Sequence, residues 1–247
     1  MDEQTKILYQ KLALYAGPFF VITFVIFWGW MGNNLPPPHP AWPAQAFTDR
    51  YVNDLASIRV GFLVSLVTIC FYLPWTAYVT MRMKRIETGP FPVLAYTQLL
   101  GGCLTVMVVS ISMWCWVVAA QRPERTPEIT QMLTDAGWLM NDTAYMCTTI
   151  QMWAMALCFL HDKKAKVPVM PNWACYLTIF CGATFFPASL TAILRDGPFA
   201  YDGLLGYWLP YPAWLIWMFV ATYYLLGDLK RRVGEEVPEG AAVAAVR

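Results

Sequence analysis

The stretch GWLMNDTAYMCTTIQ, residues 137–151, combines an apolar run with side chains that can do chemistry. If it is a helix, its polar side chains share one face, within an arc of roughly 120° at about 100° per residue. They are Asn141, Asp142, Tyr145, Thr148 and Thr149. An ionisable group is costly to bury in a membrane, so it usually faces a protein interior or a water-filled cavity. The spacing therefore predicts a functional polar face centred on Asp142.

Two kinds of chemistry fit this face. In a binding site, Asp142 would carry a proton or orient a ligand. The predicted ligand-binding residues are Asn141, Asp142, Tyr145, Thr148, Thr149 and Gln151. In an enzyme, the candidate catalytic residues are Asp142, Tyr145 and Cys147. They would act as acid and base groups on a lipid-like or terpenoid-like substrate, in an isomerase or lyase reaction that needs no metal.

A structural role for Asp142 is an equal alternative. Its carboxylate would pair with Arg59 or Arg195, which lie at similar depth near the outer ends of the second and fifth spans. Such a buried ion pair can lock helices together, and a paired carboxylate can still be a proton site. Gln151 can equally serve hydrogen bonding between helices.

Composition excludes several classes of protein. The chain has 247 residues, of which 58% are hydrophobic and 13% charged, and a net charge of +1, which argues against a nucleic-acid partner. Its seven cysteines lie in apolar runs without a C-x-x-C pair, and two histidines are too few for a haem bundle or a histidine-based zinc site. We expect neither a metal nor a cofactor.

The elements that must position the polar face are six membrane spans in an all-α fold. They are predicted at about residues 12–31, 58–81, 91–120, 137–160, 173–194 and 208–226. Together they form one membrane domain, residues 1–232, followed by a disordered cytoplasmic tail, residues 233–247. Apolar residues at helical spacing also predict short amphipathic helices on the outer face, before the second and fourth spans.

The distribution of basic residues predicts the orientation. Besides the N-terminus, they cluster after the second, fourth and sixth spans: Arg82, Lys84, Arg85; Lys163, Lys164, Lys166; and Lys230, Arg231, Arg232. All four segments fall on one side of a six-span protein. Because positive loops stay inside, both termini are predicted in the cytoplasm of a bacterial inner membrane.

A faint internal repeat links the second and fifth spans. Residues 71–91 and 185–199 each hold an aromatic residue, a proline, a threonine and a basic exit, and each ends in Gly-Pro-Phe. Inverted repeats with proline-interrupted helices are typical of transporters. Glycine and proline are also common in spanning helices generally, and a third Gly-Pro-Phe at residues 17–19 fits no such symmetry.

Several short motifs resemble those of a family of six-span bacterial inner-membrane proteins for which no activity is known. They are Ile58-Arg59-x-Gly61, Met83-Lys84-Arg85-Ile86-Glu87, Arg122-Pro123-Glu124-Arg125, Gly137-Trp138 and Gly197-Pro198-Phe199. The resemblance implies a multi-pass inner-membrane protein and assigns no site residue.

The interpretation we favour is a carrier or permease for an apolar or amphipathic small molecule. The alternatives are the cofactor-free intramembrane enzyme described above and an accessory membrane subunit of a larger complex. The expected partners are the lipid bilayer and a hydrophobic or amphipathic small molecule, with a homo-oligomer or a partner membrane subunit also possible.

Overall fold

The computed structural model describes residues 1–162 and 167–236 and is helical, with no strand in those two ranges. Six of its helices are long and apolar enough to cross a membrane: Glu3–Met31, Leu55–Ile86, Val93–Gln121, Pro127–Leu160, Asn172–Ala192 and Leu204–Gly234. The predicted all-α fold with six spans is therefore confirmed. Three of the predicted cytoplasmic lysines, in 163–166, lie outside the described residues.

Most spans are not uniform α-helices. The first span consists of α1 (Glu3–Thr23) and η1 (Phe24–Met31), and the second of α3 (Leu55–Thr68), η2 (Ile69–Phe71) and α4 (Tyr72–Ile86). The third span is α5 (Val93–Gln121), and the fourth consists of α6 (Pro127–Thr143) and α7 (Met146–Leu160). The fifth span consists of α8 (Asn172–Ala183), α9 (Phe185–Ala188) and η3 (Ser189–Ala192), and the sixth of η4 (Leu204–Trp208) and α10 (Pro210–Glu236). The segments η1 and η4 are π-helical, and η2 and η3 are 3-10 helices.

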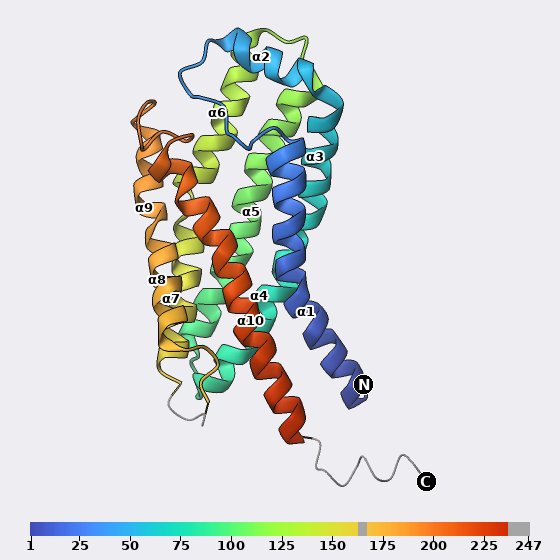
Figure 1. Cartoon of the computed structure of the whole chain (residues 1–247), viewed down its shortest axis with the longest axis vertical. Coiled ribbons are helices and arrows are strands. Elements are labelled where there is room, and N and C mark those ends of the chain that lie inside the picture. The colour runs from blue at the N-terminus through green and yellow to red at the C-terminus, as the bar shows by residue number, and fades with distance from the viewer. Residues whose placement is uncertain (163–166, 237–247) are drawn as a thin grey trace.

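The two ends of the bundle differ. The N-terminus and the end of α10 lie at one end, here called the terminal end, and helix α2 (Ala44–Asn53) lies across the other, the α2 end (Figure 1). Phe47 and Tyr51 of α2 are fully buried. Tyr51 OH lies 3.2 Å from Thr134 Oγ1, which ties α2 to α6. The orientation of these ends in a membrane stays a prediction.

Helix α5 packs against α3, α4, α6 and α7. Two glycines permit its closest approaches. A Cβ atom on Gly101 would lie 2.7 Å from the Cys147 carbonyl oxygen of α7, and one on Gly102 would lie 2.5 Å from Thr76 Cγ2 of α4. Small residues at such contacts let helix backbones approach closely, which is how helices associate in a membrane.

The end of α10 corrects part of the predicted disordered tail. The helix continues to Glu236, so residues 233–236 are helical, whereas residues 237–247 lie outside the described residues. No proline occurs between Pro212, in the first turn of α10, and Pro238, so no proline ends α10 at Arg232.

Candidate functional site

The fourth span is interrupted beside the predicted polar face. Helix α6 ends at Thr143, Ala144 and Tyr145 are not helical, and α7 begins at Met146. The span runs from Pro127 to Leu160, so the interruption lies near the middle of its length. Asp142 is in the last turn of α6 and therefore lies directly beside the break.

Asp142 is fully buried and is held by one hydrogen bond. The hydroxyl of Tyr211, in the first turn of α10, donates to Asp142 Oδ1 at 2.8 Å. The same hydroxyl accepts a hydrogen bond from Asn141 Nδ2, so three side chains form one chain of hydrogen bonds. Asp142 Oδ2 has no hydrogen-bond partner among the described residues. The site therefore joins the sixth span to the break in the fourth.

Aromatic rings pack around Tyr211, the hydrogen-bond partner of Asp142. We call Trp28, Trp138, Tyr145, Tyr207 and Tyr211 the aromatic cage. The rings of Trp28 and Tyr211 are almost parallel, at 2°, with centroids 5.7 Å apart. Tyr207 lies 4.7 Å from Tyr211, and Tyr145 meets Tyr211 edge-on at 6.0 Å. Trp138 lies 5.7 Å from Trp28 and closes the cage on the side of α6.

The fifth span is also interrupted, at a point that contacts the break in the fourth span. Helix α8 ends at Ala183 and α9 begins at Phe185. Pro187 explains this break, because a proline has no N–H to donate and its ring clashes with the carbonyl four residues earlier. The rings of Phe185 and Tyr145 stack at 18° with centroids 3.7 Å apart. The two interrupted spans therefore meet through the residues at their breaks.

The rest of the predicted polar face contacts three other helices. Thr148 Oγ1 lies 2.8 Å from Thr105 Oγ1 of α5, and Thr149 Oγ1 donates to the Gly182 carbonyl of α8 at 3.0 Å. Gln151 accepts a hydrogen bond from Tyr72 OH at 2.8 Å. Of the predicted polar face, the structure therefore brings Asn141, Asp142 and Tyr145 together around Tyr211, whereas Thr148, Thr149 and Gln151 contact other helices.

The other predicted residues lie in separate contacts. Cys147 Sγ donates to the Ala144 carbonyl at 3.2 Å and accepts from Thr105 Oγ1 at 3.9 Å. These contacts direct the thiol toward the backbone of the break and toward α5. Thr148, Thr149 and Gln151 make interhelical hydrogen bonds, the alternative role that the sequence leaves open for glutamine.

The predicted ion pair of Asp142 is wrong. Arg59 instead donates to the carbonyl oxygens of Ala120 and Gln121, at 3.0 and 2.7 Å. Those carbonyls end α5 and have no partner within the helix, so they attract a cation. Arg195 is exposed and lines a cavity of about 620 Å³ with Asp135. No basic side chain in the described part of the chain forms an ion pair with Asp142.

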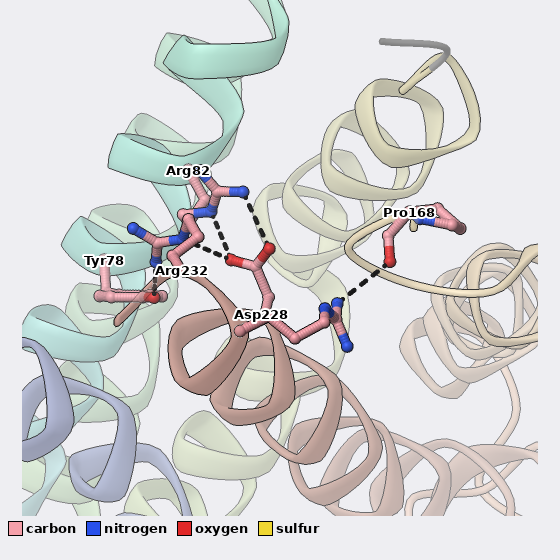
Figure 2. A network of polar contacts seen from close by, with 6 residues as sticks. Tyr78, Arg82, Pro168, Asp228 and Arg232 are labelled. Carbon is pink, nitrogen blue, oxygen red and sulfur yellow. Dashed lines mark hydrogen bonds and ion pairs between the residues drawn. The ribbon is translucent and has the colours of Figure 1, made fainter. Parts of the chain in front are cut away.

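A second buried polar cluster lies toward the terminal end (Figure 2). Arg82 of α4 places Nε 2.8 Å from Asp228 Oδ2 and donates from Nη2 to Oδ1 at 3.0 Å. Arg232 Nε donates to Asp228 Oδ2 at 3.0 Å, and its Nη2 donates to Tyr78 OH at 2.7 Å. We call Tyr78, Arg82, Asp228 and Arg232 the arginine network. It joins the second span to the sixth.

Nothing in the sequence pattern pointed to Tyr211, Trp28 or Tyr207 as parts of the site. They belong to the first and sixth spans, and aromatic residues make up 16% of the chain, so their types alone carried no signal. Within the described residues, no group of three or more His, Cys, Asp or Glu side chains lies close enough to hold a metal ion.

Comparisons with protein-family models, with curated proteins and with solved structures find no match.

Proposed function

We propose that this membrane protein is a carrier for a small apolar or amphipathic molecule and that the substrate site lies at the two helix breaks beside Asp142. The observation that supports this most is the stacking of Tyr145 on Phe185, because each of these residues lies at the break of its own span. Carriers typically bind their substrates between interrupted helices whose halves can move separately.

The surroundings of Asp142 support coupling of transport to protons. An ionised carboxylate is costly to bury without a cationic partner, and Asp142 is fully buried with the Tyr211 phenol as its hydrogen-bond partner. A carboxyl group that binds a proton while it is enclosed avoids this cost and can release the proton when the site opens. Movement of α6 relative to α7 would open the site, since Asp142 lies in the last turn before the break.

The second and fifth spans support the same function. In both, a proline is the third residue of the helix that follows an interruption: Pro74 in α4, after η2, and Pro187 in α9, after Thr184. The two spans run in opposite directions through the bundle (Figure 1). Matching interruptions in antiparallel spans are the pattern of inverted-repeat carriers.

The arginine network is suited to be one gate of this carrier. It holds α4 to α10 toward the terminal end, while the aromatic cage packs around Tyr211, the partner of Asp142, nearer the α2 end. Transport would require the two closures to open in turn, so that the site is never open to both ends.

The experiment begins with thermal unfolding of the purified protein in detergent, with a library of hydrophobic metabolites, for the wild type and Asp142→Asn. A ligand should raise the melting temperature of the wild type more than that of Asp142→Asn. That ligand is then tested for uptake into proteoliposomes under an imposed pH gradient. Uptake by the wild type that Asp142→Asn loses supports a proton-coupled carrier. Chemical conversion of the ligand without uptake would establish the enzyme in its place.

A further inference from the structure

A surface groove with a volume of about 450 Å³ lies between the second and third spans, where α4 ends and α5 begins. This part of the bundle lies toward the terminal end (Figure 1). One wall is a single face of α4, whose residues recur at helical spacing: Ala77, Thr80, Met81, Lys84 and Arg85. The other wall consists of Tyr96 and Leu99 of α5. Two neighbouring spans therefore build this groove together.

The polar end of the groove presents hydrogen-bond donors to its open side. Lys84 and Arg85 belong to the last turn of α4, and both are exposed. The Lys84 ammonium lies 5.1 Å from the centre of the Tyr96 ring and donates to Tyr96 OH at 3.3 Å. Tyr96 is 47% exposed, and its hydroxyl accepts this bond, so the hydroxyl proton remains available to a further acceptor. Two cations and one hydroxyl group thus line the same accessible groove.

No acidic side chain neutralises these cations within residues 1–162 and 167–236. Neither Lys84 nor Arg85 forms an ion pair in those ranges. Glu87, the nearest acidic residue along the chain, instead accepts from the backbone amides of Leu94 and Ala95, at 3.1 and 3.0 Å, and so caps α5. The lining of the groove contains no carboxylate. Its positive charge therefore favours an anionic ligand.

The apolar end of the groove lies deeper in the bundle than the basic end. Ala77 is two turns before Lys84, about 10 Å away at about 1.5 Å per residue. From Tyr96, exposed apolar side chains continue along one face of α5, at Leu100, Leu104 and Met107. The basic end is at the ends of two membrane spans, which is the level of lipid headgroups, and the apolar face leads into the hydrocarbon layer.

We propose that this groove binds the headgroup phosphate of an anionic phospholipid, whose acyl chains lie along the apolar face of α5. Lys84 and Arg85 bind the phosphate oxygens, and the Tyr96 hydroxyl donates a hydrogen bond to them. Basic pockets between membrane spans recognise anionic lipid headgroups in this way. A free phosphate ion would contact the basic end alone, whereas a phospholipid also covers the apolar wall and the exposed face of α5. The site does not depend on the carrier function proposed above.

Native mass spectrometry of the detergent-purified protein tests the site. Phosphatidylglycerol and phosphatidylcholine with identical acyl chains are titrated separately, and the lipid-bound fraction is measured at each concentration. The protein should be saturated by one phosphatidylglycerol at concentrations where phosphatidylcholine binds weakly. Equal affinity for the two lipids would overturn the proposal.

Thermal unfolding in detergent separates the lipid from a free anion. Phosphatidylglycerol should raise the melting temperature, and inorganic phosphate should raise it no more than chloride at the same ionic strength. If inorganic phosphate stabilises the protein as much as phosphatidylglycerol does, the groove is a site for the free anion and the lipid assignment is wrong.

Variants of the lining separate this site from general electrostatic attraction. Lys84→Gln with Arg85→Gln should weaken phosphatidylglycerol binding about 25-fold, a factor of about five for each cation at an anionic surface. Tyr96→Phe keeps the ring and should weaken binding about twofold to tenfold. Lys11→Gln with Lys230→Gln is the matched control, because both lysines are exposed and neither lines the groove. An equal loss in this control, or wild-type affinity in Lys84→Gln with Arg85→Gln, would contradict the proposal.

Discussion

Tyr145 and Phe185 stack face to face with ring centroids 3.7 Å apart; Tyr145 lies in the interruption of the fourth span, and Phe185 is the first residue after the interruption of the fifth. This contact joins the breaks of the fourth and fifth spans at one place in the bundle. Tyr145 also meets Tyr211, which holds Asp142. Two ring contacts and one hydrogen bond therefore connect both breaks to the buried carboxyl group.

The first prediction concerns the bond between Tyr211 and Asp142. Tyr211→Phe keeps the ring and removes the donor, so it should lower the free energy of unfolding by about 1–3 kcal/mol, the cost of leaving a buried acceptor without its partner. Together with Asp142→Asn and the double variant, it forms a double-mutant cycle, in which the free energy of unfolding of each protein is measured in detergent. The two losses should be non-additive by at least about 0.5 kcal/mol. Additive losses would show that the bond contributes nothing.

The second prediction concerns the arginine network. Asp228→Asn removes the carboxylate that both Arg82 and Arg232 bind and should destabilise the protein by about 3–5 kcal/mol, because the buried Arg82 and the partly buried Arg232 lose their counter-charge. Replacing the ions of the pair together, as in Arg82→Met with Asp228→Leu, should cost less than Asp228→Asn alone. Thermal unfolding of the three proteins decides this. A double variant less stable than Asp228→Asn would contradict the prediction.

The third prediction concerns helix packing at Gly101. Because a Cβ there would lie 2.7 Å from the backbone oxygen of Cys147, Gly101→Val must push α5 and α7 apart. Loss of this contact should destabilise the protein by about 1–3 kcal/mol, as overpacking usually does. Gly234→Ala is the control, since a Cβ at Gly234 meets nothing within 4 Å. Equal melting temperatures for both variants would show that α5 and α7 can separate without cost.

The fourth prediction concerns Arg50, the buried cation of α2. Its Nη2 donates to the Gly32 and Asn33 carbonyls at 3.1 and 2.6 Å and to Asn34 Oδ1 at 2.7 Å. Burial lowers the pKa of the Arg50 guanidinium, which nevertheless remains a cation because its usual pKa is so high. The guanidinium thus holds the segment that follows the first span.

A lysine cannot reproduce this fork of donors. Arg50→Lys should therefore destabilise the α2 end by about 1–3 kcal/mol and speed amide hydrogen exchange in residues 32–53, while the terminal end is unaffected. Arg122→Lys, at an exposed position, is the control. Unchanged exchange in Arg50→Lys would mean that the loop is held by its prolines alone.

The six spans could be predicted because each is an apolar run long enough to cross a bilayer, and such runs leave the chain few alternatives. The interruption at Phe185 also had a signal, Pro187, and the one before α4 had Pro74. The break at Ala144 and Tyr145 had none, because no proline or glycine lies there. Tyr145 in this break contacts Phe185 and Tyr211 of other spans, and a local sequence pattern cannot show such contacts.

The candidate site was predictable only in part. Helical spacing grouped Asn141, Asp142 and Tyr145 on one face, and they do lie in one site. The structural alternative named Arg59 or Arg195 as the partner of Asp142 by charge and depth, but the carbonyls at the end of α5 bind Arg59, and Arg195 is exposed. The actual partner, Tyr211, is uncharged and lies 69 positions along the chain, so only the packing of the sixth span reveals it.

Alternating access to the site beside Asp142 can be measured with one cysteine. Asn141 is 3% exposed, and Asn141→Cys places a thiol there without adding volume. A membrane-impermeant maleimide is added to either face of oriented vesicles, and labelling is mapped by mass spectrometry, with Cys181, a buried cysteine of α8, as the internal reference. For a carrier, residue 141 should be labelled from both faces, and Cys181 from neither. Labelling of residue 141 from only one face, or no faster than Cys181, would contradict alternating access at Asp142.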